Sequence, residues 1–173
     1  MEFVFETEYD GKAMTEMARV LRKTLRRENS CRAHIFGVVV LILGALLSIH
    51  YFLKGSAPDF IQILTWFAMA LILIVLVFED RINGYAARKM MMPGTEKARA
   101  VFREDGFISE TNVGVSEWKY DKVQVAAETE DFFVFVFSAS YGQCYDKRKL
   151  KGGTVDEFRE FIERKMGRGV WEV

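Results

Sequence analysis

The sequence predicts an α+β membrane protein: an antiparallel two-helix transmembrane hairpin plus a small β-barrel or sandwich that a C-terminal helix closes. Two uncharged apolar runs of membrane length, Ile35–Leu53 and Phe60–Phe78, predict the hairpin. From Glu96 onward apolar residues recur with the period of a β-strand, and a helical period replaces it only after Gly152-Gly153. The chain is therefore expected to have three parts: an N-terminal strand and basic amphipathic helix (1–33), the hairpin (34–79) and a cytoplasmic domain (80–173).

The amino end has the pattern of a strand. Phe3, Phe5 and Tyr9 alternate with glutamates, which gives a strand with one apolar face. So short a strand needs partners from elsewhere in the chain, and we expect its phenylalanines to pack into the cytoplasmic domain. Asp10 is a suitable N-cap for the helix that follows.

An amphipathic basic helix is expected from Lys12 to Arg27, with a break near Asn29-Ser30 before the first apolar run. Its apolar residues recur at spacings of three and four. Its basic side chains either bind anionic lipid headgroups, at ~1 kcal/mol each, or only fix the topology while the helix packs on the domain. They are Arg19, Arg22, Lys23, Arg26 and Arg27.

Each apolar run has about 19 residues, enough at ~1.5 Å per residue to cover the ~30 Å of bilayer hydrocarbon. The connection 54–59 is short and rich in turn formers, so the two helices must be antiparallel. The alternative is a buried hairpin of a soluble protein, but two uncharged runs are hard to bury in 173 residues. The runs hold no ionisable residue at mid-membrane depth, which argues against transport.

Basic residues flank the hairpin on one side only. They precede the first run and follow the second, whereas the connection contains only Lys54. This distribution predicts a multi-pass protein with both termini in the cytoplasm. The second helix is expected to continue past Phe78 and to stop before Pro93-Gly94. Met90–Met92 then form either a flexible contact surface or part of the packing.

The cytoplasmic domain is expected to be a meander of strands followed by one helix. The run Phe132–Phe137 is apolar on both faces, as in a central strand. Thr154 and Glu157 form a capping box, and Phe158 and Phe161 begin one apolar helix face. The other strands are expected over 98–103, 107–111, 116–120, 122–128 and 143–146.

Four segments of this domain support a family resemblance: Phe102 with Glu104–Ile108, then Ser116–Val123, the strand Phe132–Phe137, and Asp146–Leu150 before the final helix. With the order of elements, they make the chain similar to the YcxB-like protein family, and its C-terminal region similar to bacterial pleckstrin-homology-like folds. The resemblance implies a module anchored in the bacterial inner (cytoplasmic) membrane, without assigned chemistry.

Residues for catalysis or metal binding are not evident. The histidines are His34 and His50, at the two ends of the first run, and no Gly-rich phosphate loop or nucleophile elbow is present. Cys31 and Cys144 lie in different elements and are expected to be free thiols. The sequence thus favours a protein that is not an enzyme and has no cofactor or metal. The balanced charge of the domain argues against nucleic-acid binding.

A second basic segment precedes the last helix. It either binds phosphate-bearing headgroups or acidic protein segments, or is simply a solvated loop. We therefore expect a binding module that recognises a protein or lipid at the inner membrane face, with anionic headgroups or a membrane protein as partners. The alternative is a membrane effector whose hairpin confers immunity against a membrane-active toxin or modulates a transporter. In the second segment the candidate contacts are Lys147, Arg148 and Lys149.

Overall fold

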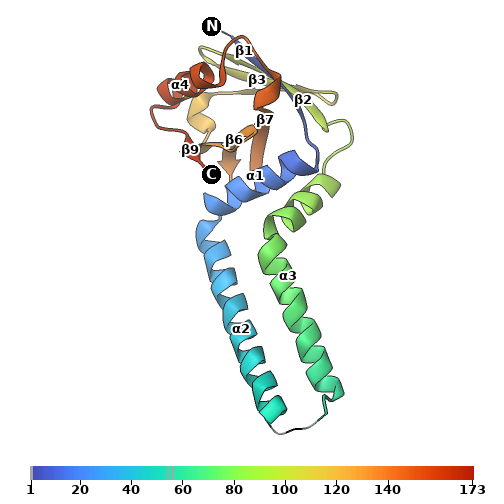
Figure 1. Ribbon diagram of the computed structural model, residues 1–173. Helices are drawn as coiled ribbons and strands as arrows, with labels where there is room; N and C mark the ends of the chain where they lie inside the picture. Colours follow the sequence, from blue (N-terminus) through green and yellow to red (C-terminus); the bar gives the residue numbers. More distant parts are fainter. Residues whose placement is uncertain (1, 54, 56) are drawn as a thin grey trace.

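The computed structural model describes residues 2–53, 55 and 57–173. The predicted turn cation Lys54 lies outside these residues. Figure 1 shows a β-rich domain standing on a pair of long helices, with helix α1 between them. The elements in chain order are β1 (Phe3–Glu8), α1 (Gly11–Lys23), α2 (Arg27–Leu53), α3 (Phe60–Lys89), β2 (Lys97–Arg103), β3 (Gly106–Thr111), β4 (Val115–Trp118), η1 (Tyr120–Lys122), β5 (Val125–Glu128), β6 (Phe132–Ser138), β7 (Tyr141–Asp146), η2 (Lys147–Lys149), β8 (Leu150–Lys151), α4 (Val155–Met166) and β9 (Trp171–Glu172).

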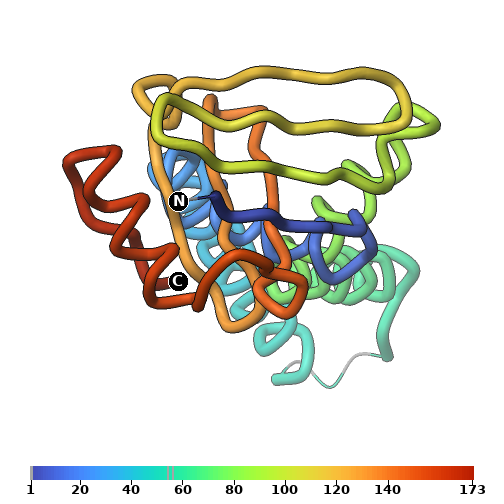
Figure 2. Tube along the Cα trace, turned by 90° about the horizontal axis from the view of Figure 1, so that it is seen from above, coloured from blue at the N-terminus to red at the C-terminus, as the bar shows by residue number. Residues whose placement is uncertain are grey.

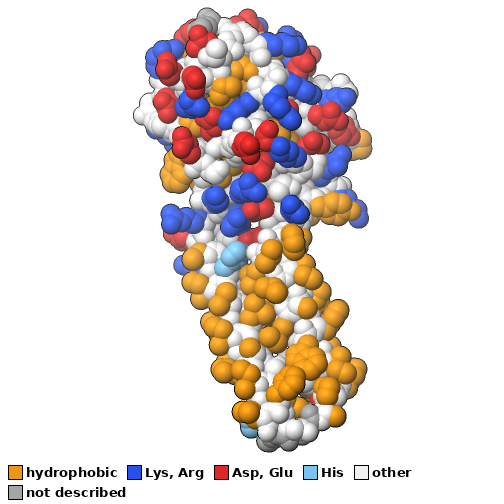
Figure 3. All heavy atoms as spheres, in the orientation of Figure 1, with side chains coloured by type: hydrophobic (Ala, Val, Ile, Leu, Met, Phe, Trp, Pro, Cys, Tyr) orange, Lys and Arg blue, Asp and Glu red, His pale blue; other side chains and the backbone are white. Residues whose placement is uncertain are grey.

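Helices α2 and α3 are both long and apolar enough to cross a membrane. Apolar side chains cover the visible surface of the pair, whereas charged side chains gather on the domain and at the junction (Figure 3). Where the helices touch, small residues allow close packing: Gly37 faces Leu76, and Gly44 faces Met69. The expected boundaries at 33 and 79 fall inside α2 and α3.

The break between the basic helix and the first apolar helix lies earlier than predicted. α1 ends at Lys23, and its C-cap residue Thr24 has a φ of −107° and a ψ of −100°, which are not helical; α2 starts at Arg27. The Thr24 hydroxyl donates to the carbonyl of Val20, a local bond that competes with helix propagation. Ser30, at the predicted break, lies inside α2 because its hydroxyl bonds to a side chain of α3 instead.

The strands form two separate sheets over the described residues, not a closed barrel. One has the order β4-β3-β2-β1-β8, and the other has the order β7-β6-β5-β9. β1 pairs antiparallel with β2, with Phe3 opposite Phe102 and Phe5 opposite Ala100. The hairpin is therefore inserted between two neighbouring strands of one sheet, and the predicted association of the N-terminal strand with the domain is confirmed.

Two predicted strands are shorter than expected because Tyr120 turns into the core. Its hydroxyl donates to the carbonyl of Arg103 at 2.7 Å, and residues 120–122 form a 3₁₀ turn. The strand predicted over 116–120 therefore ends at Trp118, and the one predicted over 122–128 begins at Val125. The two-residue strands β8 and β9 were not predicted, since they are too short to show a period.

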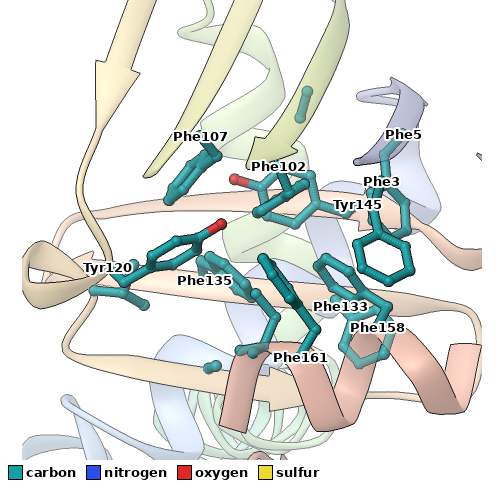
Figure 4. Packing of buried hydrophobic residues seen from close by; sticks show 14 of the residues in the cluster. Phe3, Phe5, Phe102, Phe107, Tyr120, Phe133, Phe135, Tyr145, Phe158 and Phe161 are labelled. Carbon is teal, nitrogen blue, oxygen red and sulfur yellow. The ribbon is translucent and has the colours of Figure 1, made fainter. Parts of the chain in front are cut away.

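The core lies between the sheets and is built mostly from aromatic rings (Figure 4). α4 closes one end of it with Phe158 and Phe161, and the predicted capping box at Thr154 and Glu157 is confirmed. The other face of the second sheet packs against α1 and includes the buried Cys144. β6 thus contributes side chains to both clusters, as its apolar pattern predicts.

Candidate functional site

The start of the first apolar run and the end of the second, both predicted to face the cytoplasm, lie where α1, α2 and α3 converge. In α3, Phe78 has non-helical angles, and Glu79 and Asp80 follow directly. Arg22 of α1 donates to both oxygens of Asp80, at 2.6 and 2.7 Å. This bidentate pair raises the pKa of Arg22. α1 is thereby joined to α3 at the end of its apolar run.

Glu79 joins α3 to α2. Its carboxylate lies 2.7 Å from Nε2 of His34 and accepts a hydrogen bond from the hydroxyl of Ser30 at 3.1 Å. The neighbouring Glu79 and Asp80 side chains therefore bind different helices. Together they fix how the helix pair meets α1.

A second contact between α1 and α3 involves backbone atoms. A Cβ built on Gly84 would lie only 2.8 Å from the Cα and N atoms of Thr15. The two helices can approach this closely because Gly84 has no side chain. Since α1 also packs on the second sheet, it links the domain firmly to the helix pair.

A basic pocket of about 220 Å³ opens beside this junction. Arg22 belongs to its wall, but its guanidinium is engaged by Asp80. Lys23 and Arg27 make no ion pair within the described residues, so their charges remain available. Two neighbouring cations without a carboxylate partner suit an anionic oxygen ligand such as a phosphate. The pocket is lined by Arg22, Lys23, Arg27, Ser30, Cys31 and His34.

The structure brings three of the five predicted basic residues of this region into the pocket. Arg19 instead pairs with Glu16 at 2.9 Å, and Arg26 donates to the carbonyl of Ala139. The sequence analysis did not identify Ser30, Cys31 or His34 as part of a site. The signal was present, since 27, 30, 31 and 34 follow the three-and-four spacing of one helix face.

The second predicted basic segment lies elsewhere, beside β1 and on the side of the domain away from the helix pair (Figure 1). Lys147 pairs with Glu128 at 2.5 Å, and Arg148 binds Asp146 through two hydrogen bonds. Burial raises the pKa of the Asp146 carboxyl, but the bonds from Arg148 outweigh it and the pKa is lowered. Within the described residues only Lys149 of the three makes no ion pair.

Comparison with known proteins gives a family match to part of the domain. The model of the YcxB-like protein family matches residues 102–162, from the end of β2 into α4. No curated protein and no solved structure matches the chain. The matched segment holds the strands from β3 to β8 and most of α4, and it contains the residues on which the resemblance was based. The resemblance to the YcxB-like protein family that the sequence predicts is thus confirmed over residues 102–162.

Proposed function

We propose that this protein is a membrane-anchored cytoplasmic binding module that recognises anionic lipid at the inner face of the cytoplasmic membrane. It acts by binding and not by catalysis. The observation that supports this proposal best is the basic pocket at the helix junction, in which Lys23 and Arg27 make no ion pair with described residues.

The position of the pocket relative to the bilayer fits a lipid headgroup. The uncharged run of α2 begins at Ile35, directly after His34, and that of α3 ends at Phe78, directly before Glu79. In an anchored protein these two positions mark the edge of the hydrocarbon. Ser30 and Cys31 lie about one helical turn further out, where phosphate groups reside. Basic pockets beside membrane helices on the cytoplasmic side commonly bind such headgroups.

The arrangement of the domain supports a pleckstrin-homology-like fold. Two antiparallel sheets enclose an aromatic core, and the helix α4 closes one end of it. In this proposal the domain is not recruited by lipid, because the hairpin already anchors it. Lipid bound at Lys23 and Arg27 would orient the domain on the membrane and fix the surface it presents.

Charge reversal in the pocket tests the lipid proposal. In the detergent-solubilised full chain, Lys23→Glu with Arg27→Glu is expected to weaken binding of short-chain phosphatidylglycerol about 30-fold, since each cation contributes ~1 kcal/mol. Isothermal titration measures the affinity, with short-chain phosphatidylcholine as the uncharged comparison. We expect the phosphatidylcholine affinity of wild type and variant to be alike.

The matched control is Lys119→Glu with Lys122→Glu, which changes the net charge equally at exposed positions outside the pocket and outside both predicted basic segments. This control is expected to leave phosphatidylglycerol affinity within about twofold of wild type, because exposed charges at a distance are screened. Equal losses in both double variants would show a general charge effect and no site. A wild type that does not prefer phosphatidylglycerol would also contradict the proposal.

Cysteine labelling tests the proposed topology. In a Cys31→Ser background, Ala57→Cys is expected to react with a membrane-impermeant thiol reagent in intact cells, whereas Glu160→Cys is expected to react only after lysis. The remaining Cys144 is buried and gives little background. The opposite labelling pattern would reverse the topology, and recovery of the protein without detergent would indicate a buried soluble hairpin.

A further inference from the structure

A second cavity, of about 480 Å³, opens between the two sheets. Its lining includes Ala98 at the start of β2 and Thr111 at the end of β3, whereas α4 packs near Phe102 at the other end of β2. Figure 2 shows α4 (red) and the connection between α3 and β2 (green) on opposite sides of the domain. One wall consists of inward-facing residues of the first sheet, another of the start of β7, and a third of methionines from α1 and from the segment after α3. We call this cavity the inter-sheet cleft.

Among the described residues no charged side chain lines the inter-sheet cleft, although 28% of the residues in the sequence are charged. Its polar groups are the hydroxyls of Ser109 and Ser116 and neighbouring uncharged side chains, and its apolar groups include Met17, Met90 and Met91. Such a lining does not suit a phosphate or another ion, because nothing in it balances the charge. It suits a neutral ligand that has both hydrogen-bonding and apolar groups.

Ser109 places a hydroxyl at the wall of the cleft. The residue is 6% exposed, and its hydroxyl forms no hydrogen bond with any described residue, so it is open to a molecule in the cleft. By contrast, the buried hydroxyl of Thr7 accepts a hydrogen bond from the Asp146 N–H at 3.0 Å. A hydroxyl can donate one hydrogen bond and accept others, so this group at the wall of the cavity can bind a polar group of a ligand.

The free edge of β7 offers main-chain groups to the same cleft. The N–H groups of Cys144 and Asp146 point away from β6, toward the hydroxyls of Tyr9 and Thr7. Because strand backbone groups alternate, the N–H and C=O of Gly142 point the same way, and Gly142 lines the cleft. Gly142 is buried beside Met17, whose Cγ and Sδ atoms lie 3.6 Å from the position that a Cβ would take, so this flexible side chain must move aside for another backbone to approach.

We propose that the inter-sheet cleft binds an extended, uncharged segment of a partner protein. A peptide main chain is neutral and has donors and acceptors for Gly142, Ser109 and Ser116. One apolar side chain of the segment packs on the methionines, whose flexible thioethers adapt to different shapes. Because α3 continues for up to about 16 Å beyond Phe78, a lipid chain would have to leave the bilayer to reach the cleft.

The test uses the full chain in phosphatidylcholine nanodiscs and a random decapeptide library displayed on phage. A Ser116→Glu variant, which places a charge in the cleft, serves for counter-selection. Selected peptides are expected to be uncharged, to contain an apolar residue, and to bind the variant at least tenfold more weakly than wild type. Val115→Glu is the matched control, since this neighbouring residue is exposed and does not line the cleft.

Peptides that bind Ser116→Glu as tightly as wild type, or a selection that enriches nothing over that variant, would overturn the proposal. Near-UV circular dichroism of both glutamate variants establishes that they are folded. The Lys23→Glu, Arg27→Glu protein is expected to bind the selected peptides like wild type. The peptide proposal and the lipid proposal therefore fail or succeed independently.

Discussion

Replacement of Phe5 by Ala is expected to lower the free energy of unfolding of the domain by about 3–5 kcal/mol. The Phe5 side chain is fully buried, and its ring centroid lies 4.7 Å from that of Phe158 and 5.7 Å from those of Phe102 and Tyr145. Truncation leaves a cavity among rings contributed by both sheets and by α4. Since β1 precedes the hairpin in the sequence, the result would show that the segment before α2 is an integral part of the domain.

Urea unfolding of the full chain in detergent measures this effect, with thiol modification of Cys144 as the signal and Cys31 replaced by Ser. Cys144 is 1% exposed, and burial raises the pKa of its thiol, so it reacts only when the domain opens. Val4→Ala is the control, because Val4 is the next residue of β1, faces the other side of the sheet and is only half-buried. Equal destabilisation by the two substitutions would contradict the packing described above.

Replacement of Gly84 by Ala is expected to destabilise the protein by about 1–3 kcal/mol, although the same change inside a helix usually stabilises by about 1 kcal/mol. The new Cβ would meet backbone atoms of Met14 and Thr15 at 2.8–2.9 Å. Neither helix can yield locally, because the colliding atoms are main chain. α1 must therefore move away from α3 or from the sheet beneath it.

Cys144 also reports this movement, because it lies in the cluster that α1 covers. In Gly84→Ala the thiol is expected to react faster without denaturant. Gly11→Ala is the matched control: nothing lies within 4 Å of the new Cβ, so the free energy of unfolding is expected to rise by up to ~1 kcal/mol. Stabilisation by both substitutions would show that α1 does not cross α3 at Gly84.

The sequence predicted correctly those features that depend only on residues close together in the chain. Asp10 caps α1 and Thr154 caps α4, as their positions before apolar periods predict. The alternating pattern of β1 and the two-sided apolar pattern of β6 likewise predicted which of their side chains are buried. The break near Ser30 was wrong for the opposite reason. A polar residue in a helix can bond within its own backbone or to another helix, and only the partner decides which.

The arrangement of the strands in two open sheets also could not be predicted from local patterns. The strand pattern could not distinguish a barrel from two sheets, because closure depends on whether the edge strands pair, and pairing is not encoded in the period of either edge. Here β4 and β7 remain edges, and the inter-sheet cleft lies between their sheets. The uncharged lining of that cleft combines residues from the beginning, middle and end of the chain.

By itself the sequence determined two helices of membrane length, a basic flank, a β-rich domain and the YcxB-like resemblance, since composition and period depend on neighbours along the chain. Only the tertiary structure decided which basic residues are available. Arg22 is neutralised by Asp80, 58 residues away, and Lys147 by Glu128, whereas Lys23 and Arg27 make no ion pair among the described residues. Charge pairing depends on distances of a few ångströms in space, and the order of residues in a chain does not specify those distances.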